Sequence, residues 1–272
     1  MGSQGKDSQG NSRLSATRAH VKQCEDCADQ PAMANLFFDR YLNGEHAEVW
    51  ADLVDLGTAV RSQGYYKDAI EVAVETMKRA RHNVESIIVK LEKLGYEFSK
   101  EEASGVFSPP TPKAALALDR FEGDIGGPLP ISLRQWYEHV GVVNLMGHHE
   151  ALNPSDGRIF SDPLVIDPFT ESPGGDFDGD FSKQGTGMIE LELAPSADLK
   201  AHQFQDCGDP ECYSMKVPDL AVDGLLLWEL HCTTFVNYLR LVFQWGGFPG
   251  WHAENEAPQQ ELDFLKRGLL PI

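Results

Sequence analysis

The chain has 272 residues, 42% of them hydrophobic, which is enough to build one large core or two modest ones. Lys and Arg number 23 and Asp and Glu number 42, so the formal net charge is −19 at pH 7. This balance argues against direct binding to nucleic acid or to an anionic membrane, because phosphate groups are bound by clustered Lys and Arg. We expect an acidic surface that attracts a basic protein. The open alternative is that the charge only maintains solubility.

The sequence predicts a cytoplasmic protein. It contains no stretch that approaches the roughly 18 apolar residues of a membrane span, and its polar N-terminus lacks the apolar segment of a secretory signal. Its five cysteines are an odd number in a long chain, unlike a secreted disulfide framework.

The first third of the chain divides into a polar leader and a helical region. Residues 1–32 are rich in Ser, Gln, Gly and Asp, so we expect a disordered tail. Residues 33–98 show a helical period, and we predict a separate domain of antiparallel helices there. Its most regular part repeats an apolar residue every three or four positions, at Ile70, Ala73, Met77, Ala80, Val84, Ile87, Leu91 and Leu94.

Residues 99–113 contain three prolines with Ser and Gly, and we predict a linker there. A second domain is expected over residues 114–272. It begins with a helix that Gly126 and Gly127 end. Ser132, with Gln135 three positions later, matches a capping box and predicts the start of a second helix that Gly141 ends.

The rest of the second domain alternates between strand and helix signals. Runs rich in β-formers occur at residues 142–146, 163–166, 187–193 and 211–217. Residues 224–245 are apolar nearly all round and predict one long core helix that covers the sheet, and a closing helix is expected around residues 258–267. The predicted fold class is therefore α+β: an antiparallel helical segment, then a mixed domain with a mostly antiparallel sheet covered by helices.

No motif of a known catalytic or cofactor site occurs in the sequence: GxSxG, a P-loop, GxGxxG and HExxH are all absent. We therefore expect no cofactor and assign no catalytic residue. Cys232 falls within the predicted core helix, where a cysteine usually serves as a small buried hydrophobe.

Two cysteine pairs leave a zinc site open as an alternative. Cys24 and Cys27 have the spacing of a zinc knuckle, and Cys207 and Cys212 supply two more thiols. The pairs are about 180 residues apart and the first lies in the predicted tail, so we assign no metal ligand.

An acidic, glycine-rich stretch near residues 171–186 is the strongest candidate for partner binding. Asp176, Asp178 and Asp180 alternate as in the first half of a calcium loop, but the glycine and glutamate that such a loop requires are replaced by Phe181 and Gly187. We interpret these three aspartates as a surface at which a basic partner docks.

Two further pairs of residues raise the question of a site. His148 and His149 follow a predicted strand and point to opposite faces, so we expect solvent-facing histidines that do not share one metal ion. Trp136 and Tyr137 lie side by side on a predicted helix. Such aromatic residues are usually core anchors, and the alternative is that they line a ligand pocket.

Over residues 114–245 the chain resembles the SUKH superfamily, the yeast cell-wall regulator-like fold that supplies many bacterial immunity proteins. The resemblance rests on the order helix, Gly-Gly, Leu-Pro, capped helix, Gly and strands. The residues that carry it are Glu122, Gly126, Leu129, Pro130, Trp136, Tyr137 and Gly141. It implies a non-enzymatic binding scaffold in which these residues fix the fold and a variable surface selects the partner.

The sequence thus favours a cytoplasmic, non-enzymatic binding protein of the immunity or antitoxin type, whose acidic surface binds a basic protein such as a toxin domain. The alternative, from another functional class, is a zinc-binding regulator or a metal-dependent hydrolase that uses the four cysteines or the carboxylates of residues 176–180.

Overall fold

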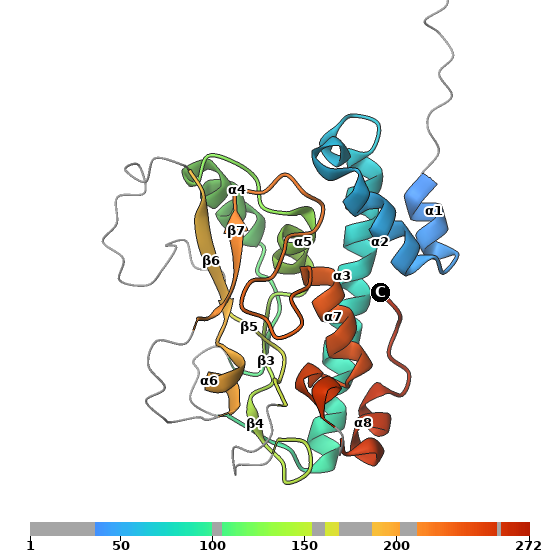
Figure 1. The fold of residues 1–272 in the computed structure, drawn as a ribbon, viewed down its shortest axis with the longest axis vertical. Coiled ribbons are helices and arrows are strands. Elements are labelled where there is room, and N and C mark those ends of the chain that lie inside the picture. Colours follow the sequence, from blue (N-terminus) through green and yellow to red (C-terminus); the bar gives the residue numbers. More distant parts are fainter. Residues whose placement is uncertain (1–35, 100–104, 154–160, 169–186, 202–210, 255–256) are drawn as a thin grey trace, which may run out of the picture. The chain divides into compact units, whose positions relative to one another are not determined.

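A computed structural model describes residues 36–99, 105–153, 161–168, 187–201, 211–254 and 257–272 (Figure 1). The chain divides into two units, Met1–Ala34 and Asn35–Ile272, and the first, with the whole of the predicted tail, lies outside the described residues. The helices are α1 (Leu36–Leu42), α2 (His46–Asp55), η1 (Gly57–Arg61), α3 (Tyr66–Leu94), α4 (Ala114–Asp124), α5 (Ile131–His139), α6 (Ala197–Ala201), α7 (Phe235–Gln244), η3 (Pro249–Ala253) and α8 (Gln259–Lys266). The strands are β1 (Glu97–Phe98), β2 (Phe107–Ser108), β3 (Val142–Asn144), β4 (Gly147–His148), β5 (Val165–Ile166), β6 (Ile189–Ala194) and β7 (Tyr213–Val217).

The predicted α+β class is confirmed. All strand pairs within the described residues are antiparallel, in three small sheets with the orders β1-β4, β2-β3-β5 and β6-β7. In β6 the apolar side chains of Leu191 and Leu193 are buried while Glu190 and Glu192 are exposed, as the alternating sequence predicts. No helix in the described part of the chain is long and apolar enough to cross a membrane.

The predicted helical segment is organised around α3. Its apolar face is buried over most of its length, and the helix ends at Gly95, whose φ of 80° is the left-handed conformation that glycine adopts readily. The carboxylate of Asp68 accepts the backbone N–H groups of Phe37 and Phe38 at 2.8 and 2.9 Å and so caps α1. The indole N–H of Trp50 donates to Thr76 at 3.1 Å and ties α2 to α3.

Residues 35–272 form one compact unit, which spans the predicted boundary between a helical domain and an α+β domain. Helix α3 packs against α5 and α8 as well as against α1, and Figure 1 shows it running along the later elements. The predicted linker also contributes β2, which pairs with β3, while β1 just before it pairs with β4. The apolar face of a helix predicts that another element of the protein packs against it, but the periodicity of that face does not identify which element.

The predicted core helix over residues 224–245 is half wrong, since only Phe235–Gln244 is helical. Residues 225–234 form a hairpin-like excursion in which Leu225 pairs with Thr234, and Leu227 bonds to Ser214 of β7. The excursion ends at Thr234, whose extended backbone precedes α7. This segment is as apolar as the helix but carries β-branched Thr233 and Thr234, which favour extended structure.

The predicted capping box at Ser132 does not form. Helix α5 begins at Ile131, directly after Pro130, and the Ser132 hydroxyl donates to the carboxylate of Asp223 at 2.7 Å. The same carboxylate accepts the backbone N–H of Val236 at 3.1 Å and caps α7. Burial raises the pKa of Asp223 to about 6. Asp223 therefore joins the starts of two helices.

Candidate functional site

The hairpin at residues 225–234 carries a strained tip, which we define as residues 228–232. Its arms are held by the backbone N–H of Leu227, which donates to Ser214 at 2.8 Å, and that of Leu226, which donates to Thr233 at 3.0 Å. Trp228 and Cys232 have φ angles of 62° and 51°, in the left-handed region that non-glycine residues rarely adopt. Such conformations are concentrated at functional sites, where the surrounding contacts maintain them.

The side chain of Trp228 is displayed to solvent in a fixed orientation. Trp228 is 52% exposed, yet its indole N–H donates to a carboxylate oxygen of Glu190 at 2.8 Å. The hydroxyl of Ser214 donates to the same oxygen at 2.5 Å. The Ser214 and Trp228 hydrogen bonds lower the pKa of Glu190, which keeps this carboxylate ionised.

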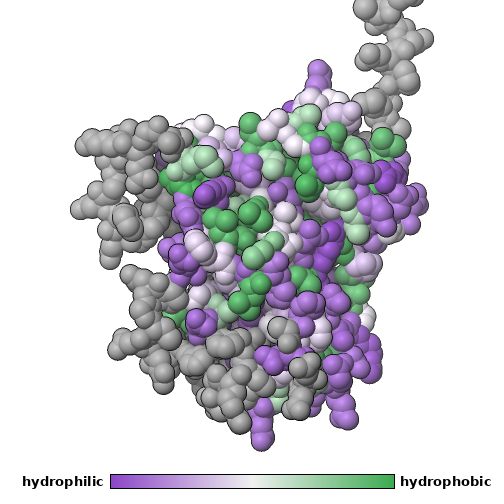
Figure 2. All heavy atoms as spheres, viewed as in Figure 1, coloured by the Kyte–Doolittle hydropathy of each residue, from purple (hydrophilic) through white to green (hydrophobic). Residues whose placement is uncertain are grey.

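Other exposed residues extend the surface around Trp228. Leu225 and Leu230 of the same hairpin are exposed, as is Met188 next to β6, and Glu190 and Glu192 project from β6 on its wet face. We call these six residues the tip surface. Figure 2 shows apolar side chains gathered near the middle of this face, where Figure 1 shows the chain passing from β7 to α7. An apolar centre with an acidic border is typical of a protein-docking surface.

A buried polar pair holds the tip from inside. The side chain of Glu229 is fully buried, and its two oxygens contact the Nδ1 atom and the backbone N–H of His231, the latter at 2.9 Å. His231 and His252 line a pocket of about 510 Å³ together with Leu230, Thr233, Leu241 and Gly250. The tip thus places one imidazole in a fixed orientation at the wall of a pocket.

A second buried network lies next to the tip. The Lys200 amine and the Asp162 carboxylate form an ion pair of 2.7 Å in which both side chains are fully buried, and the Tyr213 hydroxyl donates to Asp162 at 3.1 Å. The Lys200 amine also lies 4.2 Å from the centre of the Tyr213 ring. Desolvation raises the pKa of Tyr213, which also contacts the backbone of Leu230. This network connects the tip to the core.

The residues that carry the SUKH resemblance make structural contacts. The Glu122 carboxylate accepts the backbone N–H of Leu129 at 2.9 Å and pairs with Arg134. The indole N–H of Trp136 donates to the carbonyl of Gly141 at 2.8 Å, and Trp136 is fully buried. Leu129 is buried too, Pro130 precedes α5, and Gly126 has a φ of 76°.

Gly141 is the most constrained of these positions. Its φ is 93°, and a Cβ atom placed on it would lie 2.4 Å from the backbone oxygen of Ser108. Because that oxygen belongs to β2, the absence of a side chain allows the segment before α4 to approach the end of α5 closely.

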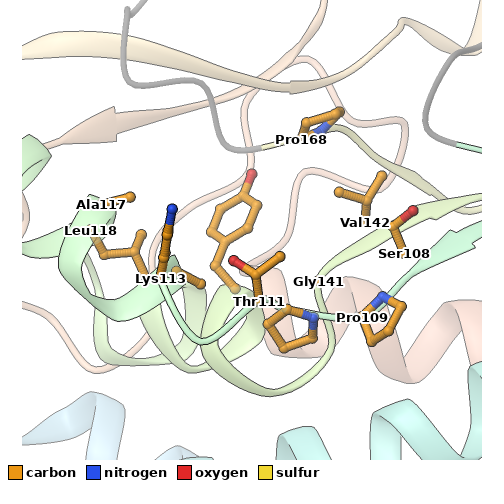
Figure 3. A pocket seen from close by; sticks show the side chains of 12 residues that line it. Ser108, Pro109, Thr111, Lys113, Ala117, Leu118, Gly141, Val142 and Pro168 are labelled. Carbon is orange, nitrogen blue, oxygen red and sulfur yellow. The ribbon is translucent and has the colours of Figure 1, made fainter.

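Tyr137 is both a buried core residue and part of a pocket wall, the two roles that the sequence left open for Trp136 and Tyr137. It is nearly fully buried, and its hydroxyl donates to the carbonyl of Asp167 at 3.4 Å, but it also lines a pocket of about 340 Å³ between α4, α5 and the proline-rich segment. Figure 3 shows Thr111 and Lys113 on one side of this pocket and Ser108, Val142 and Pro168 on the other. Trp136 is a core anchor, whereas Tyr137 is both anchor and pocket wall.

The proposed docking residues Asp176, Asp178 and Asp180 lie outside the described residues, as do Cys24, Cys27 and Cys207. Cys212 is partly exposed. Cys232 is exposed at the tip, which corrects the prediction that it is buried in a helix. Within the described ranges, no three His, Cys, Asp or Glu side chains are close enough to share a metal ion.

The histidine pair that follows β3 agrees in part with its prediction. His148 is exposed at the end of β4, whereas His149 is partly buried and its Nδ1 atom accepts the backbone N–H groups of Ala151 and Leu152 at 3.3 Å. His149 therefore stabilises a turn.

Comparison with known protein families, with curated protein sequences and with solved structures finds no match to this chain. The site must therefore be judged by its geometry. Sequence reasoning missed the tip surface, because it assigned Trp228 and Leu230 to a buried helix. The signal that was available is the sequence WELHC, in which polar Glu229 and His231 alternate with apolar residues, a period of two that favours extended structure over a helix.

Proposed function

We propose that this chain is a non-enzymatic binding protein of the SUKH type, an immunity or antitoxin factor of the bacterial cytoplasm. In this proposal the tip surface docks a basic protein, such as a toxin domain. The observation that carries the proposal is the exposed ring of Trp228, which the ionised carboxylate of Glu190 holds in place. Tryptophan is strongly enriched among residues that dominate binding energies, and a fixed ring loses little conformational entropy on binding.

Three further observations support this function. The net charge of −19 favours encounter with a cationic partner. Glu190 and Glu192 put negative charge next to the apolar centre, so a partner with Lys or Arg around an apolar patch would complement it. The SUKH-like residues from Glu122 to Gly141 serve packing and hydrogen bonding, which is the role that the resemblance assigns to them.

The test is affinity capture from the native cells with the full chain as bait, at low and high salt, followed by mass spectrometry. We expect one basic protein that is retained at low salt and lost at high salt. With that partner purified, Trp228→Ala should weaken binding by roughly 30-fold or more, which corresponds to about 2 kcal/mol.

The matched control is Leu116→Ala, because Leu116 is an equally exposed apolar residue on α4, away from the hairpin. It should leave the affinity unchanged. If the partner tolerates Trp228→Ala and is lost only when Asp176, Asp178 and Asp180 are changed to Asn, the docking surface is the acidic segment and the tip assignment is wrong. Binding that ignores salt would remove the electrostatic part of the proposal.

A further inference from the structure

We propose that His231 and His252 bind a divalent transition-metal ion such as Zn²⁺, with Glu229 as the positioning residue of His231. This site is distinct from the cysteine site considered from the sequence, and it does not depend on the docking proposal.

The contact between Glu229 and His231 prepares one nitrogen atom for metal binding. A carboxylate can only accept, so its contact with Nδ1 selects the tautomer in which Nδ1 carries the proton and Nε2 is left as the nitrogen that can bind a metal ion. A carboxylate behind a histidine is the usual arrangement at metal sites, where it fixes the ring and increases the basicity of the free nitrogen. Its second oxygen is fixed by the backbone N–H of His231, so the carboxylate cannot rotate freely.

His252 is at a suitable distance to supply the second ligand. The ring centroids of His231 and His252 are 5.3 Å apart, with an angle of 67° between the ring planes. Two imidazoles that bind one tetrahedral Zn²⁺ through nitrogen at the usual bond length place their centroids about 5 Å apart. The separation of the two rings therefore matches that of two imidazole ligands of one ion.

The surroundings favour a cation. The pocket that both histidines line contains no Lys or Arg among its described lining residues, and the buried carboxylate of Glu229 lies directly behind His231. Imidazole ligands suit Zn²⁺, Cu²⁺ and Ni²⁺ better than Mg²⁺ or Ca²⁺, which prefer oxygen. Two protein ligands leave coordination positions for water or for a donor from a bound partner.

Isothermal titration of the full chain with ZnCl₂ tests the site. We expect the wild type to bind one Zn²⁺ more than the double variant His231→Ala/His252→Ala, and each single variant to lose most of this binding. The control is His148→Ala, which removes an exposed histidine at the end of β4 and should leave the titration unchanged. Glu229→Gln should weaken binding by roughly 10- to 100-fold, the usual effect of removing a residue that orients a metal ligand.

Thermal unfolding distinguishes a lost ligand from a misfolded variant. Zn²⁺ should raise the Tm of the wild type and of His148→Ala but not that of the double histidine variant. Without metal the double variant should unfold cooperatively at a lower Tm than the wild type, because the buried Glu229 carboxylate loses its His231 partner, so the metal-induced rise is the readout. Identical titrations of wild type and double variant would overturn the proposal. So would Zn²⁺ binding that disappears in Cys24→Ser/Cys27→Ser and persists in the double histidine variant. Neither result would affect the docking proposal, which the capture experiment and the Trp228→Ala variant test separately.

Discussion

Two tryptophans with satisfied indole N–H groups illustrate two uses of the same side chain in this molecule. Trp136 of α5 is fully buried and bonds to the carbonyl of Gly141, while Trp228 at the tip is 52% exposed and bonds to Glu190. The first hydrogen bond satisfies a polar atom inside the core. The second orients a large apolar surface that remains in contact with water.

The comparison shows that rigidity and burial are separate properties. Trp136 is fixed by packing, including an edge-to-face contact with Phe235 at 5.6 Å, and its apolar surface already contributes to folding. Trp228 is fixed by a hydrogen bond, and most of its apolar surface is still available. Folding stability should therefore depend on the first residue and partner binding on the second.

The largest effect is expected for Trp136→Ala. Loss of this buried ring should lower the free energy of unfolding by about 3–5 kcal/mol, because it creates a cavity and leaves the Gly141 carbonyl without its indole donor. Urea unfolding followed by far-UV circular dichroism measures it. Trp136→Phe keeps part of the ring and should lose clearly less. A loss below about 1 kcal/mol for the alanine variant would break the comparison.

Gly141→Ala is expected to cost about 2–4 kcal/mol. The new Cβ would approach the Ser108 oxygen within 2.4 Å and would impose the strain of a left-handed φ. Gly126→Ala is a matched control, because Gly126 also has a positive φ but no heavy atom lies within 4 Å of the added Cβ. It should cost only about 1 kcal/mol. Equal losses in urea unfolding would mean that the close approach of β2 contributes nothing.

Asp223→Asn should change how stability depends on pH. Burial raises the pKa of Asp223 to about 6, so the folded wild type binds this proton more tightly than the unfolded chain does. The free energy of unfolding of the wild type should therefore decrease as the pH rises from about 4 to about 6. The variant should lack this contribution. Over that range the wild type should therefore lose about 1–3 kcal/mol relative to the variant, measured by urea unfolding at each pH. Parallel profiles for the two proteins would contradict the prediction.

The smallest effect on stability is expected for Trp228→Ala, within about 0.5 kcal/mol, because most of the ring is exposed and little apolar area is lost. The same variant should have a large effect on partner binding. Glu190→Gln removes the charge that orients the ring and should reduce affinity by less than Trp228→Ala does. A large loss of stability in Trp228→Ala would show that the tip belongs to the core and would remove the contrast with Trp136.

The elements with a clear period or a strong end signal could be predicted from the sequence. The repeat from Ile70 to Leu94 with Gly95 gave α3, and the alternation of Leu191 and Leu193 with two glutamates gave β6. In each case one face is buried and the other is wet, so local pattern and burial agree.

The errors arose where a tertiary contact decides the local structure. Ser132 has the spacing of a cap, but its hydroxyl bonds to Asp223, which lies 91 positions away. Residues 225–234 are apolar enough for a helix, but pairing with Ser214 and the burial of Glu229 make them a hairpin. The candidate site lies in this hairpin, so a search for motifs could not locate it. Among the residues singled out from the sequence, those of the SUKH resemblance, such as Glu122 and Trp136, could be chosen because they follow a short local pattern.

The pairing of β1 with β4 and the packing of α3 on later helices have a consequence for how the chain can be divided. Because β1 precedes residues 100–104 and its partner β4 follows them, and because α3 packs against α5 and α8, a cut in that stretch would give two pieces that each expose an unpaired strand edge and an apolar face covered by the other piece in the whole protein. Each piece alone should be insoluble, whereas coexpression should restore one folded particle. The protein is therefore a natural candidate for fragment complementation, with reassembly as a reporter of proximity between two fused proteins.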